Sequence, residues 1–366
     1  MSAALAPLLP VYPRAGVTFV EGDGAWLTDS EGKRYLDFAA GIAVVGLGHR
    51  HPAVTAAAHA QLDRLWHASN LYATEPAERL AAALAERWPG AQAFFCNSGT
   101  EANEAAIKYA YKATGKTKIV ALERSFHGRT LGALAATGQP AKREPFAPLL
   151  ADVVFVEAGD TSQFDDAGLI LIEPIQGEGG VHPIDADFIL AAAESDALLC
   201  LDEIQTGMGR TGTFFAFEQL DVEPDLVTLA KGLANGLPIG ALLVGQQAAG
   251  AFAVGDHGST FGGNPVTCAA ATAVCAELTD ELLASVRSLG QKLLAAELPH
   301  VVEARGRGLL VGYELDVEAQ PVVDAALEHG LVALTAGKNV LRLAPPLIIT
   351  EEQVDDALAI LAEVLA

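Results

Sequence analysis

The stretch "LVTLAKGLANGLPIG", residues 226–240, joins a short apolar run to a lysine and a glycine-rich segment. Residues 226–230 have the continuous apolar character of a buried strand, and the glycines and proline after Lys231 indicate a loop. A buried ammonium group is costly unless it is paired or neutralised. Lys231 therefore either reaches water or is retained for chemistry, since loops at strand ends deliver side chains into sites.

Similar apolar runs recur on both sides of this stretch and alternate with helical patterns. The clearest helical segment is "TEANEAAIKYAYKATG", residues 100–115. This alternation predicts an α/β fold, with a mostly parallel seven-stranded sheet covered by helices. The seven runs are "AQAFFCN", "KIVALE", "ADVVFV", "LILIEP", "ALLCLDE", "DLVTLA" and "ALLVG".

The pattern changes near residue 264, and this change predicts two domains. Residues 51–263 form the expected large domain. Residues 264–366 have the mixture of long helices and short strands that is typical of a smaller α+β domain. Residues 1–50 contain hairpin-like strands, and we expect them to join the smaller domain.

Composition excludes several classes of partner. The 366 residues include 46 acidic and 23 basic side chains, and the resulting charge of −23 opposes binding to nucleic acid or anionic lipid. The sequence has no run of about 18 apolar residues, so we expect no membrane span, and no export signal is evident. Four cysteines without metal-ligand spacing are expected to be buried free thiols, which fits a cytoplasmic protein without a metal: Cys96, Cys200, Cys268 and Cys275.

Polar residues directly follow three of the apolar runs, where open α/β sheets bind ligands. Gly99 and Thr100 precede a helix and suit a phosphate, although a simple helix cap has the same pattern. Asp202 and Glu203 end another run, as a solvated acid pair also could. With Lys231 they form the set needed to hold a phosphorylated aldehyde cofactor as a Schiff base.

Two other motifs suggest different chemistry. Residues 207–212, "GMGRTG", satisfy the G-x-G-x-x-G dinucleotide pattern, and Asp225 follows near the expected distance. However, "DEIQT" separates the motif from its strand and no helical pattern follows it, which disfavours an NAD-binding protein. His49 and His51 have a spacing seen at metal sites, but without accompanying ligands we interpret them as part of a turn before a helix.

Several motifs together resemble those of the class III pyridoxal-phosphate-dependent aminotransferases. They are "NSGTEANEAAIK", "SFHGRT", "EPIQGEGG", "LDEIQTGMGRTG", "LAKGLANGLPIGA", "GSTFGGNP" and "RLAPPL", and they span nearly the whole chain. "YLDFAAGIAV" and "LGHRHP" resemble the acetylornithine aminotransferase branch. The resemblance implies a fold-type I enzyme, a homodimer with active sites at the subunit interface, and pyridoxal 5'-phosphate bound to Lys231.

The resemblance also assigns cofactor contacts. Asp202 would pair with the pyridine nitrogen, Phe126 would lie against the ring, and Gln205 would contact the phenolic oxygen. Thr260 would reach the phosphate from the other subunit. Lys231 and Asp202 are the expected catalytic residues, and the expected cofactor-binding set is Gly99, Thr100, Phe126, Asp202, Glu203, Ile204, Gln205, Lys231 and Thr260.

Four further residues are assigned to substrates. Arg129 matches the arginine that binds the α-carboxylate of acetylornithine, with Ser259 contributed by the neighbouring subunit. Arg342 matches the arginine for the α-carboxylate of 2-oxoglutarate, and Glu178 matches the acid that masks it. The implied reaction transfers the terminal amino group of N2-acetylornithine to 2-oxoglutarate and gives N-acetylglutamate 5-semialdehyde and glutamate.

Some positions depart from the branch pattern and leave other substrates open. Val45 and Gly46 replace the commoner Asn-Ala, Ala73 replaces an aromatic residue, and the segments "TSQFDDAG" and "AAAESDALL" look shortened. Succinyldiaminopimelate, succinylornithine and a carrier-linked aminoadipate semialdehyde are the alternative substrates. A non-catalytic or NAD-binding protein of similar fold is the alternative of another class. Cys96, His127 and Arg210 border the motifs and are assigned no chemistry.

Overall fold

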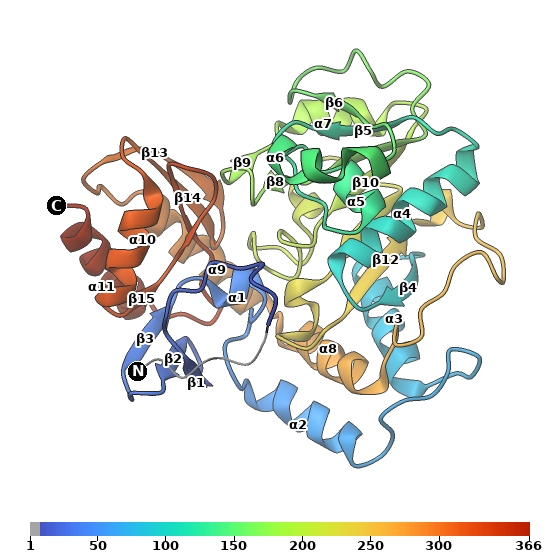
Figure 1. Ribbon diagram of the computed structural model, residues 1–366. Helices are drawn as coiled ribbons and strands as arrows, with labels where there is room; N and C mark the ends of the chain where they lie inside the picture. The colour runs from blue at the N-terminus through green and yellow to red at the C-terminus, as the bar shows by residue number, and fades with distance from the viewer. Residues whose placement is uncertain (1–7) are drawn as a thin grey trace.

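The computed structural model describes residues 8–366. Figure 1 shows a large α/β unit beside a smaller unit, to which both ends of the described chain contribute. Among residues 8–366, no helix is both long and apolar enough to cross a membrane.

The large unit is built on a seven-stranded sheet with the strand order β4-β12-β11-β10-β7-β5-β6. Strand β12 runs antiparallel to both of its neighbours, and the other pairs are parallel. The predicted mostly parallel sheet is therefore confirmed. Its strands are β4 (Gln92–Cys96), β5 (Ile119–Leu122), β6 (Val154–Val156), β7 (Leu169–Ile172), β10 (Leu198–Asp202), β11 (Leu226–Leu229) and β12 (Gly240–Val244).

The central strands are mostly apolar because helices and loops cover both faces. All residues of β7 and β11 are buried. Helix α4 packs against β11 and β12, and α7 packs against β10. The covering segments are α4 (Gly99–Thr114), α5 (Leu131–Ala135), α6 (Pro140–Arg143), α7 (Ala186–Ala193), η1 (Glu144–Leu149), η2 (Ala216–Gln219), η3 (Lys231–Ala234) and η4 (Gln246–Ala248), with the small hairpin β8 (Ile175–Gln176) and β9 (His182–Pro183).

The smaller unit contains two four-stranded sheets, with the orders β13-β14-β17-β16 and β1-β2-β3-β15. Strand β3 near the N-terminus pairs in parallel with β15 near the C-terminus, so this sheet joins the two ends of the chain. The elements are β1 (Phe19–Asp23), β2 (Trp26–Asp29), β3 (Arg34–Asp37), β13 (Val301–Arg307), β14 (Leu310–Leu315), β15 (Leu331–Val332), β16 (Leu334–Thr335), β17 (Val340–Leu343), α1 (Ala40–Ala43), α9 (Asp280–Leu294), α10 (Ala319–Glu328) and α11 (Glu351–Val364).

Three helices form a separate layer: α2 (Pro52–Leu62), α3 (Glu75–Arg87) and α8 (Pro265–Glu277). Helix α2 begins directly after His51, which confirms the interpretation of this histidine pair as a turn before a helix. Helix α8 follows residue 263, yet it packs against α2, α3 and η3 of the large unit. The packing boundary between the two units therefore lies beyond α8.

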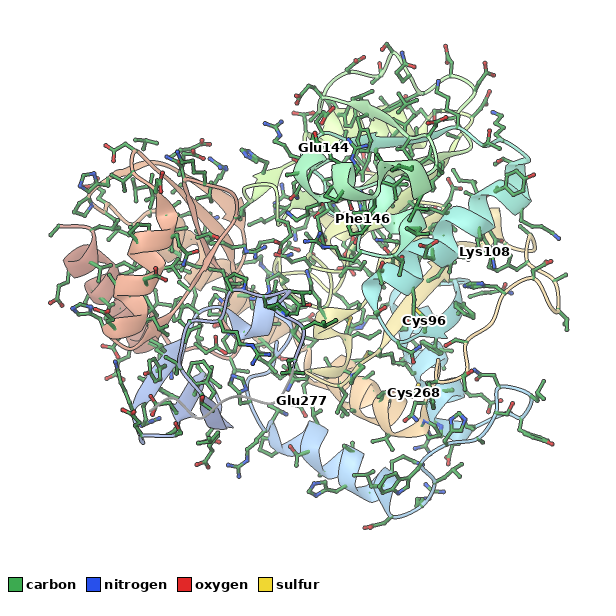
Figure 2. All side chains as sticks on the ribbon, in the orientation of Figure 1. Cys96, Lys108, Glu144, Phe146, Cys268 and Glu277 are labelled. Carbon is green, nitrogen blue, oxygen red and sulfur yellow. The ribbon has the colours of Figure 1, made fainter. Side chains whose placement is uncertain are left out.

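The cysteines are buried and free, as the sequence predicted. Cys96 ends β4 and Cys268 lies in α8 (Figure 2). Burial raises the pKa of both thiols to about 12, so they remain protonated at neutral pH.

Candidate active site

A cavity of about 370 Å³ lies where β4, β10 and β11 end. This position agrees with the general rule that open α/β sheets bind ligands at the carboxyl ends of their strands. The structure brings together most of the residues that the sequence assigned to the cofactor, and also Arg129. Those that line the cavity are Gly99, Thr100, Phe126, Arg129, Asp202, Ile204, Gln205 and Lys231.

Lys231 follows β11 and opens the short helix η3, with its side chain in the cavity. Its φ of 41° lies in the left-handed region, which is strained for a residue with a side chain and is found most often at functional sites. Burial lowers the pKa of the Lys231 ammonium, and this effect outweighs the acids Glu178 and Asp202, which raise it. A neutral amine is thus more readily available as a nucleophile or base.

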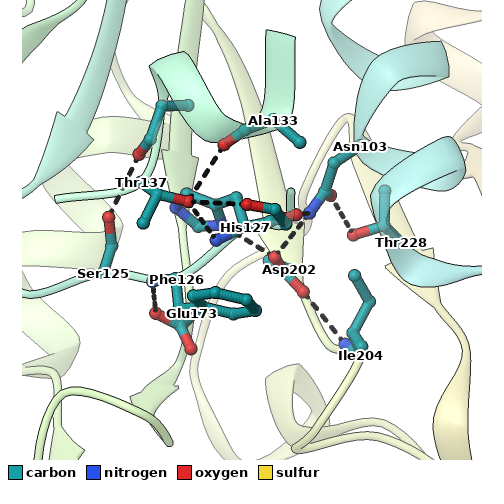
Figure 3. Close-up of polar contacts among 12 residues, drawn as sticks. Asn103, Ser125, Phe126, His127, Ala133, Thr137, Glu173, Asp202, Ile204 and Thr228 are labelled. Atoms are coloured by element: carbon teal, nitrogen blue, oxygen red, sulfur yellow. Dashed lines mark hydrogen bonds and ion pairs between the residues drawn. The ribbon is translucent and has the colours of Figure 1, made fainter. Parts of the chain in front are cut away.

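Asp202 is held by three hydrogen bonds at the end of β10 (Figure 3). Its Oδ2 accepts from His127 Nδ1 at 2.7 Å and from Asn103 Nδ2 at 2.8 Å. Its Oδ1 accepts from the Ile204 N–H at 3.1 Å. Asn103 is fixed in turn by the Thr228 hydroxyl at 2.8 Å. This network fixes one carboxylate in the cavity wall.

His127 is a buried neighbour of Asp202 that the sequence interpretation missed. Because a carboxylate only accepts, His127 Nδ1 carries the proton in the contact with Asp202. The imidazole is buried, and its Nε2 has no partner among the described residues. The motif "SFHGRT" was the available signal, but the partner Asp202 lies 75 positions away.

The start of α4 forms a cradle for an anion. Ser98 is the N-cap of this 16-residue helix, whose free N–H groups and dipole favour negative charge. A side chain on Gly99 would approach Ile204 Cδ1 to 2.6 Å, and one on Gly128 would collide with the Thr100 hydroxyl. These glycines keep the backbone accessible. Thr100 Oγ1 accepts from the N–H groups of Arg129 and Thr130 and fixes the opposite wall.

Glu203 does not line the cavity, contrary to the expectation from its motif. Its two carboxyl oxygens accept from the N–H groups of Ala216 at 2.6 Å and Phe217 at 2.8 Å. It therefore anchors the start of η2. Burial raises the pKa of Glu203 to about 8.

Ser259 and Thr260 do not line the cavity that contains Lys231. They line a second cavity of about 870 Å³. Ser259 Oγ accepts from Asn97 Nδ2 at 3.2 Å. Thr260 is exposed, and so is the neighbouring Phe261. A contact between Thr260 and the cofactor of another subunit thus stays a prediction.

Arg342 and Glu178 form an ion pair beside the cavity. Arg342 Nη1 donates to Glu178 Oε1 at 2.6 Å, to Gly177 O at 3.0 Å and to Gln205 Oε1 at 3.2 Å. Gln205 lines the cavity, so the ion pair of Arg342 and Glu178 is separated from the cavity by this one side chain. Burial alone would raise the pKa of Glu178, but Arg342 and then Lys231 outweigh burial and hold this pKa below its ordinary value.

Residues 207–212 form turns and a bend, and only the short helix η2 follows them, so the dinucleotide pattern lacks the α-helix that it requires. Arg210 in this segment is buried and donates to the carbonyl oxygens of Leu309 and Pro345. It thereby ties the segment to the smaller unit.

Comparisons with known proteins agree with this geometry. The model of the family "Aminotransferase class-III" matches residues 11–365. This chain belongs to the class III aminotransferases. It is a pyridoxal-phosphate-dependent aminotransferase, and the predicted family, fold type and cofactor are confirmed.

Relatives of known name are similar over nearly their whole length. The acetylornithine aminotransferase of Mycolicibacterium smegmatis is 49% identical over 98% of this chain and 96% of its own. The solved N-acetylornithine aminotransferase of Stenotrophomonas maltophilia is 38% identical with a TM-score of 0.82, covering 97% and 96%. The solved ornithine aminotransferase of Toxoplasma gondii is 30% identical with a TM-score of 0.92, covering 98% and 91%.

The cavity residues fit pyridoxal phosphate by their chemistry. The cradle at Gly99 and Thr100 offers backbone N–H groups to a phosphate, Asp202 offers a fixed carboxylate to the ring nitrogen, and Lys231 offers an amine to the aldehyde. Phe126 lines the same cavity and offers an apolar face to the ring.

Proposed function

We propose that this enzyme transfers the terminal amino group of N2-acetylornithine to 2-oxoglutarate, giving N-acetylglutamate 5-semialdehyde and glutamate, a step of arginine biosynthesis. The single observation that carries the proposal is the masked arginine. Arg342 is paired with Glu178 beside the Lys231 cavity, while Arg129 stays open within it. Such a site can accept first a donor with one carboxylate and then a dicarboxylic acceptor.

The residues would divide the first half of the reaction among them. Arg129 would bind the α-carboxylate of the donor, since a guanidinium suits this planar anion. The amine of Lys231 would take the proton from the reacting carbon of the donor and pass it to the cofactor, so that this carbon is oxidised and the amino group stays with the cofactor. When bound, pyridoxal phosphate supplies an electron-accepting ring that stabilises the negative charge formed when this carbon loses its proton. Asp202 would pair with the ring nitrogen.

The second half needs Arg342. The γ-carboxylate of 2-oxoglutarate would use Arg129, and its α-carboxylate would use Arg342 after Glu178 turns away. The side chain of Glu178 is 26% exposed, whereas that of Arg342 is only 3% exposed. Glu178 is therefore the partner with room to move.

We also propose a homodimer in which Ser259 and Thr260 complete the site of the partner copy. Large apolar side chains near this segment are strongly exposed, as a subunit interface would explain: Leu71 at 87%, Tyr72 at 73% and Phe261 at 61%. Analytical ultracentrifugation measures the mass. A mixture of Lys231→Ala and Thr260→Ala chains tests whether the sites share residues, because only a mixed dimer regains one intact site.

A panel of amine donors with 2-oxoglutarate, read out as glutamate, tests the proposed reaction. N2-acetylornithine should give the highest kcat/KM among acetylornithine, ornithine, lysine and 4-aminobutyrate. Exclusive use of unacylated donors would contradict the proposal. A cytoplasmic location, which we propose because the cysteines are free thiols, is checked by cell fractionation.

A further inference from the structure

Lys142 places a second cation at the donor side of the cavity. It lies in α6, and its Nζ is 5.8 Å from the centre of the Phe126 ring. The guanidinium carbon of Arg129 is 5.7 Å from the same centre. Phe126 and Arg129 both line the cavity, so Lys142 stands at its border, beside the arginine assigned to the donor carboxylate.

The position of Lys142 is fixed by Gln139. The Lys142 ammonium donates to Gln139 Oε1, and Gln139 Nε2 donates to the carbonyl oxygens of Arg124 and Ser125 at 3.2 and 3.4 Å. These carbonyls directly precede Phe126 in the chain. The amide thus ties the lysine to the backbone that carries the ring.

Two cations over one ring repel each other unless an anion lies between them. Burial lowers the pKa of Lys142 and Arg129 lowers it further, while Glu178 raises it. Glu178 is bound to Arg342 at 2.6 Å and makes no ion pair with Lys142. A carboxylate of the substrate bound beside Arg129 and Lys142 would relieve the repulsion between these two cations.

We propose that Lys142 is a specificity-determining residue, which favours N2-acyl donors whose acyl group ends in a carboxylate. The inference rests on the proposed function. In such a donor the acyl nitrogen and the α-carboxylate share one carbon, so binding of that carboxylate by Arg129 brings the acyl chain beside Arg129 as well. A dicarboxylic acyl group, such as succinyl, carries a second anion to this place. An acetyl group carries none.

Three donors separate charge from length: N2-acetylornithine, N2-succinylornithine and N2-butanoylornithine, which has the carbon count of the succinyl compound without its carboxylate. The variant is Lys142→Met, because methionine keeps an unbranched chain and removes the charge. We expect kcat/KM for the succinyl donor to fall about tenfold, through KM, as for a lost hydrogen bond to a charged group. The other two donors should change less than about twofold.

Lys118→Met is the matched control. Lys118 precedes β5 at the strand's N-terminal end, opposite the cavity, and donates to Asp165 O at 2.8 Å. The Lys118→Met variant changes the net charge by the same amount as Lys142→Met and should leave kcat/KM for all three donors unaffected.

Equal loss for all three donors in Lys142→Met, or no loss for the succinyl donor, would overturn the role of Lys142. If the wild-type enzyme turns over none of the three donors but uses unacylated amines, the proposed function fails instead, and the inference fails with it. The wild-type measurements therefore distinguish the two failures before any variant is compared.

Discussion

Glu178 Oε1 lies 2.6 Å from Arg342 Nη1, and this contact hides the charge of an arginine whose side chain is 3% exposed. The pair also contacts Gln205 in the cavity wall. Breaking one side of a buried pair leaves the other charge uncompensated, so the two single variants should have different consequences.

Arg342→Ala should damage the half-reaction with 2-oxoglutarate by on the order of a hundredfold, because the α-carboxylate of the acceptor loses its charged partner. The half-reaction with acetylornithine should change far less, since Arg342 is masked there. Single-turnover kinetics of each half, followed by cofactor absorbance, measure the two losses. Arg305→Ala is the control, because Arg305 is also buried and paired, with Glu303 and Glu314, but none of its partners lines the cavity. Equal losses in both half-reactions would refute the proposal that Glu178 masks Arg342 in the first half and releases it in the second.

Glu178→Ala should weaken the discrimination between donors. Without the carboxylate, the charge of Arg342 faces the cavity during the first half-reaction and favours donors that place an α-carboxylate there. We expect kcat/KM for glutamate as a donor to rise relative to that for acetylornithine. The ratio of these two constants is the measurement. Glu178→Asp, which keeps the charge, should lie between the wild type and the alanine variant.

Lys231→Ala should abolish turnover, because no other lysine among residues 8–366 lines the cavity. Borohydride treatment of the wild-type holoenzyme should fix the cofactor covalently to the peptide that contains Lys231, and mass spectrometry identifies that peptide. The variant should bind cofactor without this covalent product. Fixation at another lysine would contradict the assignment.

Asp202→Asn should slow proton removal by on the order of a hundredfold, since the amide offers the ring nitrogen no charge. His127→Phe should show a smaller loss, because His127 acts through the orientation of Asp202. The double variant should be little worse than Asp202→Asn alone, as expected for residues that act as one unit. Rates of donor deprotonation in single turnovers provide the comparison, and additive losses would mean that His127 acts independently.

Local sequence patterns predicted the sheet because each buried strand is a short run of mostly apolar residues, as in β7 and β11. The same patterns could not place α8. Its alanine-rich sequence fits either unit, and only its contacts with α2, α3 and η3 decide. Boundaries set by packing are therefore less predictable than elements set by periodicity.

The position of a site residue was predictable where one residue type suits one role: Lys231 and Asp202 both line the cavity, as expected. It was less predictable for Glu203, because successive side chains at a strand end point to opposite sides. Asp202 faces the cavity, and its neighbour Glu203 faces the start of η2. His127 was missed for another reason. Its contact is with Asp202, which lies 75 positions away, so the local sequence around the histidine does not indicate this partner.

Glu203→Gln should alter stability and its pH dependence without loss of the cofactor. The pKa of Glu203 in the folded protein is about 8, above its ordinary value of 4.5, so the folded state holds a proton that the unfolded state releases as the pH rises between these values. Its contribution to the free energy of unfolding is therefore complete below about pH 4.5 and is lost as the pH rises toward 8. Urea unfolding at pH 5, 6, 7 and 8 should show a flatter pH dependence for the variant than for the wild type. Cofactor absorbance should be unchanged, because Glu203 contacts Ala216 and Phe217 and does not line the cavity. Loss of bound cofactor in a variant that stays folded would restore Glu203 to the cofactor site.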